Sequence, residues 1–137
     1  MAEPTTAHAR PDIDIENDIY DLIMTYPPTA SDRRQIHIRV QGGAVTLSGH
    51  VKTPINRRYL LNKVPQLSGV THFDSSRLFD EETIRIDSGR ALPIGMLVNV
   101  RMGTVILTGT LPEGVDLEAV ATTINRLPGV ERVVAQF

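Results

Sequence analysis

The chain has 137 residues and a net charge of −2 at pH 7; 41% of the residues are hydrophobic and 22% are charged. These values are typical of soluble globular proteins and give no overall attraction to a polyanion, so any electrostatic recognition has to be local. The sequence contains no cysteine, which excludes disulfides, thiolate metal sites and cysteine nucleophiles, and its length fits one average domain or two small ones.

The first eleven residues carry charges and a proline but no apolar segment like that of a secretory signal. No stretch of the sequence approaches the roughly 18 consecutive apolar residues of a membrane span. We therefore expect residues 1–11 to be a disordered tail. We also expect a cytoplasmic protein, or a periplasmic one if a leader has been removed.

The segment that follows predicts a helix, because apolar residues recur every three or four positions and two prolines end the pattern. Asp12 or Asp14 can cap this helix. The run Asp12-x-Asp14-x-Glu16 resembles the start of a calcium loop, but Asn17 and Ile23 stand where such a loop needs glycine and glutamate. We interpret these carboxylates as stabilising the helix N-terminus through its dipole.

A β-hairpin is predicted next, because apolar and polar residues alternate on both sides of Gly42-Gly43. Pairing around this turn places Arg39 opposite Thr46 and His37 opposite Ser48. A helix follows from residue 53 and ends early at Pro65, and a last strand then runs from residue 70 to about residue 78.

The same pattern occurs a second time, because residues 36–73 align without a gap on residues 96–133. The two turns share a glycine at their second position, Gly43 in the first copy and Gly103 in the second. We expect this glycine to supply a positive φ. Eight positions are identical, which are Val40/Val100, Gly43/Gly103, Val45/Val105, Leu47/Leu107, Gly49/Gly109, Leu67/Leu127, Gly69/Gly129 and Val70/Val130.

The two copies differ in front of the hairpin. In the second copy this region, residues 80–95, contains Gly89, Pro93 and Gly95, which interrupt a helical pattern. We expect a short extra strand at residues 83–87 followed by a loop. The second copy is therefore predicted to lack the leading helix.

Both copies resemble the BON domain, a family named from bacterial osmotically inducible and nodulation proteins. The resemblance rests on the hairpins at residues 38–51 and 98–111, followed by Leu-Ser-Gly-Val at residues 67–70 and Leu-Pro-Gly-Val at residues 127–130.

The resemblance implies an α+β fold with two modules, residues 12–80 and 81–137. Each would be a roughly three-stranded mixed sheet with helices on one face, in the order α-β-β-α-β, with the second copy lacking its first helix. It also implies no catalytic residues, no cofactor, and a role in contacting phospholipid, envelope components or other ligands. Some cytoplasmic members are proposed to be ion or small-ligand sensors.

Charge is the most informative local feature, because residues 33–73 contain seven Lys or Arg residues and no Asp or Glu. Near an anionic membrane each such cation contributes about 1 kcal/mol. The alternative is an ordinary solvated face, balanced by the acidic runs at residues 12–21 and 80–82. The candidate binding residues on this basic face are Arg33, Arg34, His37, Arg39, His50, Lys52, Arg57 and Arg58.

The outward face of the second hairpin is more apolar, because alternation points Leu97 and Ile106 away from the core. We expect this face to pack against the first module or against a second chain, the latter giving a homo-oligomer.

The histidines do not indicate a metal site. His37 and His50 are diagonal neighbours, but no third ligand is evident, and Arg39 and Lys52 would oppose a cation. No catalytic motif is present, and only 4% of the residues are aromatic, so a nucleic-acid platform is not expected.

The sequence therefore predicts a non-enzymatic binding or adaptor protein. Its basic first module would contact anionic phospholipid, the envelope or a protein partner. The alternative is a cytoplasmic sensor that binds an ion or small ligand between the two modules.

Overall fold

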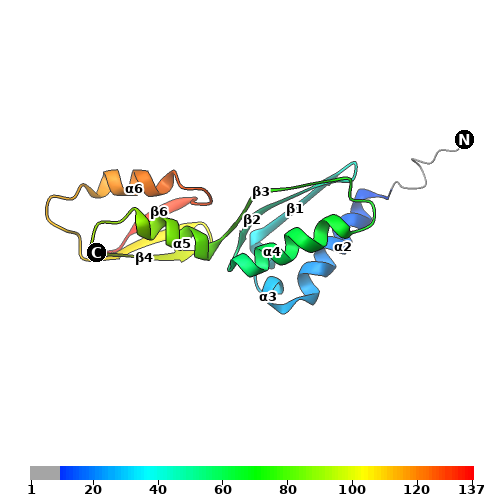
Figure 1. Ribbon diagram of the computed structural model, residues 1–137, viewed down its shortest axis with the longest axis horizontal. Helices are drawn as coiled ribbons and strands as arrows, with labels where there is room; N and C mark the ends of the chain where they lie inside the picture. Colours follow the sequence, from blue (N-terminus) through cyan, green and yellow to red (C-terminus); the bar gives the residue numbers. More distant parts are fainter. Residues whose placement is uncertain (1–9) are drawn as a thin grey trace, which may run out of the picture.

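The computed structural model describes residues 10–137 and places them in two modules that lie end to end (Figure 1). The predicted tail therefore lies outside the described residues, apart from its last two. Of these, Arg10 donates a hydrogen bond to the Asp18 carboxylate at 2.7 Å and another to the Ser68 carbonyl at 2.9 Å.

The first module contains a three-stranded sheet in the order β1-β2-β3, with β1 antiparallel and β3 parallel to the central strand. The predicted hairpin register is confirmed, since Arg39 pairs with Thr46 and His37 with Ser48. The elements are α2 (Asp12–Thr25), α3 (Pro27–Ala30), η1 (Arg33–Gln35), β1 (Ile36–Gln41), β2 (Ala44–Val51), α4 (Pro54–Lys63), η2 (Val64–Gln66) and β3 (His72–Asp80).

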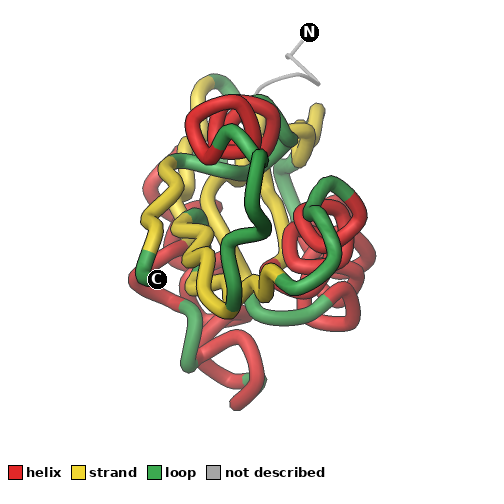
Figure 2. Tube along the Cα trace, turned by 90° about the vertical axis from the view of Figure 1, so that its left-hand side faces the viewer, coloured by secondary structure: helices red, strands yellow, loops and turns green. Residues whose placement is uncertain are grey.

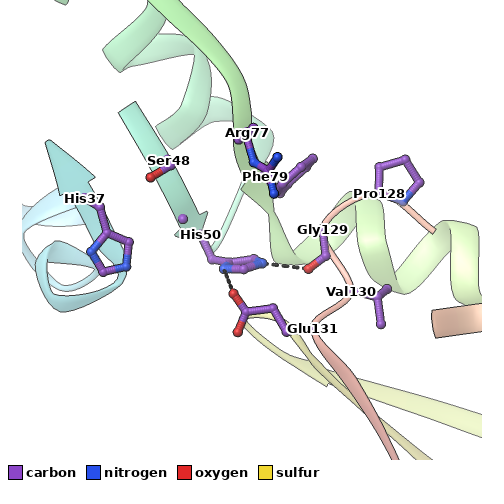
Figure 3. A pocket seen from close by; sticks show the side chains of 10 residues that line it. His37, Ser48, His50, Arg77, Phe79, Pro128, Gly129, Val130 and Glu131 are labelled. Carbon is purple, nitrogen blue, oxygen red and sulfur yellow. Dashed lines mark hydrogen bonds and ion pairs between the residues drawn. The ribbon is translucent and has the colours of Figure 1, made fainter. Parts of the chain in front are cut away.

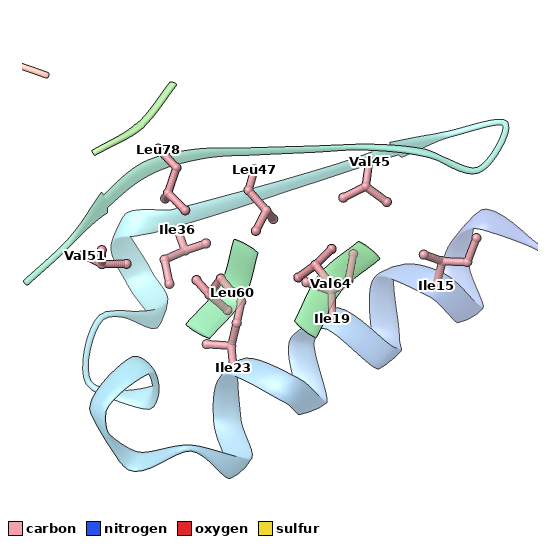
Figure 4. Close-up of a cluster of buried hydrophobic side chains, with 10 residues drawn as sticks. All are labelled: Ile15, Ile19, Ile23, Ile36, Val45, Leu47, Val51, Leu60, Val64 and Leu78. Atoms are coloured by element: carbon pink, nitrogen blue, oxygen red, sulfur yellow. The ribbon is translucent and has the colours of Figure 1, made fainter. Parts of the chain in front are cut away.

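Helices α2 and α4 cover one face of this sheet and leave the other face open. Val45 and Leu47 point from β2 toward Ile19 of α2 and Leu60 of α4, and all four side chains are buried in one cluster (Figure 4). Burial of such aliphatic side chains contributes roughly 1.5–3 kcal/mol each and is the main force holding the helices on the sheet.

The second module repeats this arrangement with the order β4-β5-β6 and its own core. Its elements are α5 (Glu81–Arg90), β4 (Met96–Arg101), β5 (Thr104–Gly109), α6 (Leu117–Asn125) and β6 (Arg132–Ala135). Figure 2 shows the chain along its long axis, with the second module nearest the viewer. The expected α+β fold with two mixed three-stranded sheets is confirmed.

The expectation that the second module lacks a leading helix, with a strand at residues 83–87, is wrong. Helix α5 begins directly after β3, where the Asp80 side chain caps it by accepting hydrogen bonds from Thr83. Ile84 and Ser88 face the core. Gly89 lies in the last turn, and the proline and second glycine come after the helix has ended.

The constant offset of the repeat does not align α5 with α2, because the segment between the leading helix and the hairpin is shorter in the second module. Between α2 and β1 the first module has α3 and η1, which have no counterpart between α5 and β4. There the buried Asp32 accepts hydrogen bonds from the Lys52 backbone N–H at 2.9 Å and the Asn56 amide at 3.3 Å, which ties this segment to the start of α4. Val51 is fully buried beside it, whereas the corresponding Leu111 is 38% exposed.

An acid at the start of each leading helix binds the hairpin turn. The Asp12 carboxylate accepts from the N–H groups of Gly42 at 2.9 Å and Gly43 at 3.1 Å, and the Glu81 carboxylate accepts from Met102 N–H at 2.9 Å. Neither expected role of Asp12, as a cap or as a dipole partner alone, accounts for this contact, which joins helix to sheet.

We predict that Asp12→Ala lowers the free energy of unfolding by about 1–2 kcal/mol, because two turn N–H groups lose a charged acceptor. Glu16→Ala, an exposed acid on the same helix, should change it by less than about 0.5 kcal/mol. Chemical denaturation measures both values. Equal effects of the two substitutions would contradict a stabilising role of the contact between Asp12 and the hairpin turn.

Candidate functional site

The two modules are joined without a linker, and a histidine side chain connects them. Strand β3 ends at Asp80 and α5 begins at the next residue. His50 is only 4% exposed, and its Nε2 lies 2.7 Å from the Gly129 carbonyl oxygen of the second module (Figure 3). Because a carbonyl can only accept, Nε2 carries a proton and donates. The other ring nitrogen, Nδ1, lies 3.8 Å from the Glu131 carboxylate.

Close packing around this imidazole depends on two glycines. A Cβ at Gly129, where φ is +87°, would lie 2.8 Å from Cγ of Phe79. A Cβ at Gly103 would lie 2.9 Å from Cε1 of His50 and 2.7 Å from Cγ of Glu131. All three distances are shorter than real Cβ contacts, so a side chain at either position would have to displace its neighbours.

The role expected for Gly103 is therefore wrong. In the second hairpin Met102 has the positive φ, 54°, whereas in the first hairpin Gly42 and Gly43 have it. Gly103 is needed because the junction leaves no room for a side chain.

A cleft of about 420 Å³ opens beside His50, between the open face of the first sheet and the turn before β6. We call it the junction cleft. Figure 3 shows His37, Ser48 and Arg77 on its first-module side and the turn of residues 128–131 on the other. The lining residues are His37, Ser48, Gly49, His50, Arg77, Phe79, Pro128, Gly129, Val130 and Glu131.

A β-bulge brings Arg77 into this cleft. Thr46 pairs with Asp74, but the next open-face residue of β2, Ser48, pairs with Arg77, so β3 has one extra residue between the two pairs. Bulges commonly redirect a side chain in this way. Without the bulge Ser76 would stand beside Ser48, and Arg77 would point toward the core.

The bulge also holds the Asp74 carboxylate in place on the open face. Hydrogen bonds from the hydroxyl and then from the backbone N–H of Ser76 lower the pKa of Asp74. The backbone bond is 2.8 Å long. Asp74 therefore remains ionised in the row that contains Arg39, so the open face is not uniformly basic.

The single basic face expected from the sequence does not form. His37 and Arg39 lie on the open face of the sheet, whereas Arg57 and Arg58 lie on α4, which packs against the opposite face. Arg57 donates to the Leu78 carbonyl at 2.6 Å and to the Ser75 carbonyl at 3.3 Å, so it holds the bulge.

The other predicted residues are separated as well. Arg33 and Arg34 lie in the exposed η1 segment, and Lys52 lies beside Asn99 on another side of the junction. His50 is buried instead of exposed, because the second module covers it.

Sequence reasoning missed Arg77 and Glu131. The only local signal for Arg77 was the adjacent pair of serines at positions 75 and 76, which interrupts the alternation of the strand. Glu131 gave no signal, because its place beside His50 depends on how the two modules meet.

The predicted apolar face of the second module is not covered by the first module. Leu97 is 62% exposed, and Ile106 is half-buried on the open face of the second sheet, where it pairs with Val134. Contact of this face with a second chain stays a prediction.

The chemistry of the junction cleft is that of an anion site with one opposing charge. Arg77, the His37 imidazole and the Ser48 hydroxyl can donate hydrogen bonds to a phosphate or carboxylate, whereas Glu131 repels it. Within residues 10–137 no group of three or more His, Asp or Glu side chains could hold a metal ion, and no helix is long and apolar enough to cross a membrane.

Comparison with known proteins gives one family and one structural likeness. The family model described as BON domain matches residues 14–74 and 86–137. No curated protein sequence matches the chain significantly.

Two similar solved structures are of CdsD, a structural protein of the type III secretion system of Chlamydia trachomatis. One, of its C-terminal domain, is 17% identical with a TM-score of 0.72 over 88% of this chain and 62% of that chain. The other is 15% identical with a TM-score of 0.71 over 92% of this chain and 62% of that one. The chain thus spans less than two thirds of either, and the likeness concerns the fold.

We predict that in the His50→Ala variant the two modules stay folded but move independently. The reason is that the Gly129 carbonyl loses its hydrogen-bond donor while each hydrophobic core is kept. Residual dipolar couplings should fit one alignment tensor in the wild type and need two in the variant. His72→Ala, an exposed histidine of β3, should behave like the wild type. A single tensor for His50→Ala would contradict the role given to this hydrogen bond.

Proposed function

We propose that this chain, which belongs to the BON domain family, binds an anionic group of its ligand in the junction cleft. The family itself indicates a non-enzymatic binding or adaptor role. The cleft supplies a site for that role, since residues of both modules line it.

The observation that carries the proposal is the row formed by His37, Ser48 and Arg77 across the three strands of the first sheet. A guanidinium can donate two parallel hydrogen bonds to a phosphate or carboxylate, and the hydroxyl and imidazole beside it can bind the remaining oxygens. The bulge that moves Arg77 into this row supports a binding role, because a regular strand would not place a cation there.

Two sources of the anion fit this chemistry. One is a small soluble phosphate or carboxylate, for which a cleft of about 420 Å³ has a suitable size. The other is a phospholipid headgroup, which Arg39 on the adjoining open face would also attract. We favour the small ligand, because the cleft lies between the modules.

A second candidate function is that of a protein adaptor, and the exposure of Leu97 favours it. Ile94 is 98% exposed and lies just before the same strand, so apolar side chains gather at this end of the second sheet. Exposed patches of this kind commonly bind other proteins. The first module would then bind the ligand while the second binds a protein partner or another copy.

We predict that Arg77→Glu weakens the binding of inorganic phosphate at least about tenfold, because a bidentate donor becomes a repelling carboxylate. Isothermal titration calorimetry measures the affinity. Arg58→Glu is the matched control, since Arg58 is exposed on α4 on the other side of the sheet. Loss of binding in the Arg58 variant alone would contradict the cleft and favour a basic helix face.

Vesicles distinguish the two sources of the anion. Sedimentation with phosphatidylglycerol vesicles, compared with phosphatidylcholine vesicles, should leave the wild type in solution if the ligand is a small soluble anion. Binding to the anionic vesicles that Arg77→Glu abolishes would identify a lipid headgroup instead. No binding of either probe would contradict the proposed function.

For the adaptor role, we predict that Leu97→Asp combined with Ile106→Asp reduces self-association or partner binding, because a charge in an apolar contact is costly. Light scattering coupled to size exclusion measures the mass over a range of concentrations. Ile55→Asp, at an exposed isoleucine of α4, is the control. Unchanged solubility, melting temperature and hydrodynamic size in the double variant would contradict an interface at this face.

A further inference from the structure

One carboxylate stands in the junction cleft among groups that otherwise favour an anion. Glu131 belongs to the turn before β6, and its side chain is 72% exposed. Its carboxylate faces Nδ1 of the buried His50 at 3.8 Å. An ionised Glu131 with a neutral His50 cancels the charge of Arg77, so the cleft then has little net attraction for an anion.

The hydrogen bond to Gly129 determines where His50 can take up a second proton. Nε2 already donates to the Gly129 carbonyl, so only Nδ1 is free to gain a proton. Nδ1 is the ring nitrogen that faces Glu131. A proton taken up at Nδ1 therefore lies beside the Glu131 carboxylate.

We propose that protonation of His50 is a switch that pairs Glu131 and thereby opens the junction cleft to an anion. The inference rests on the proposed function of the cleft and adds its regulation. With a neutral His50, the free Glu131 carboxylate repels the ligand at the rim. With a charged His50, the carboxylate is held by the imidazolium, and Arg77 is left to bind the anion.

Each charged group that faces His50 acts in a defined direction. Glu131, from the second module, favours the charged imidazole. Arg77 on β3 and an ionised His37 on β1 oppose it, and both line the same cleft. A bound anion neutralises these two cations, so anion binding and proton uptake should favour each other.

Protonation of His50 also strengthens the contact between the two modules. A neutral His50 joins them through the Gly129 hydrogen bond, and a charged one adds the ion pair with Glu131. The anion-bound state is therefore also the state with the more rigid junction. The junction thus has two states, and proton uptake and anion binding both favour the more rigid one.

The test uses inorganic sulfate and the full chain, because the charge of sulfate does not change between pH 5.5 and pH 7.5. Calorimetry of the wild type should give an affinity about tenfold higher at pH 5.5, within the usual range of coupling between two sites. Titrations in buffers of different ionisation enthalpy should show proton uptake on binding at pH 7.5. Thermal melting checks that each variant is folded at both pH values.

Glu131→Gln is the decisive variant, because it removes an exposed carboxylate without disturbing a core. At pH 7.5 it should bind sulfate nearly as tightly as the wild type does at pH 5.5, and its pH dependence should be weaker than that of the wild type, because His50 has lost the carboxylate that favours its charged form. His50→Gln, which keeps an N–H donor but cannot become charged, should bind weakly at both pH values. His37→Gln is the matched control and should keep most of the pH dependence.

Three results overturn the switch while leaving the site intact. The first is a wild-type affinity for sulfate that is equal at the two pH values. The second is a Glu131→Gln variant that is as pH-dependent as the wild type. The third is a His37→Gln variant in which the pH dependence disappears. No sulfate binding at either pH would overturn the switch and the proposed anion site together.

Discussion

The hydrogen bond from His50 to the Gly129 carbonyl fixes how the two modules are arranged, together with the bond from Glu82 N–H to the Lys52 carbonyl and the packing of Phe79 on the second core. The chain passes from β3 into α5 without a linker, so a small rotation at this point would move the whole second module. A buried donor bound to a carbonyl of the other module opposes such a rotation, because breaking the bond leaves both groups without partners. This bond helps to hold the turn of residues 128–131 beside the first sheet, where the two line the junction cleft.

The two modules share a scaffold and differ in their surfaces. In both, an acid at the start of the leading helix binds the hairpin turn, through Asp12 or through Glu81. The open face of the first sheet carries polar side chains such as His37, whereas Leu97 stands at the corresponding place in the second. The two modules thus share one fold and expose different faces, and in the proposed function the first module binds the ligand and the second contacts a partner.

Features that depend on local periodicity could be predicted from the sequence, and features that depend on long-range placement could not. Alternation gave the register of Arg39 with Thr46, because strand periodicity is a local property. Helix α5 could not be predicted by alignment with α2, because the second module lacks a segment equivalent to α3 and η1. Gly89 also interrupts the helical pattern of the sequence, although it lies in the last turn of α5. The burial of His50 depends on the meeting of two modules, which no periodicity within either one encodes.

An NMR titration with phosphate tests most directly whether the two modules form one binding site. The account predicts that amide shifts change together in β3 around Arg77 and in the turn at Gly129 and Glu131, with a single affinity. Shifts confined to the first module would contradict it, as would shifts centred on Arg58 of α4, because either result would place the ligand away from the junction cleft.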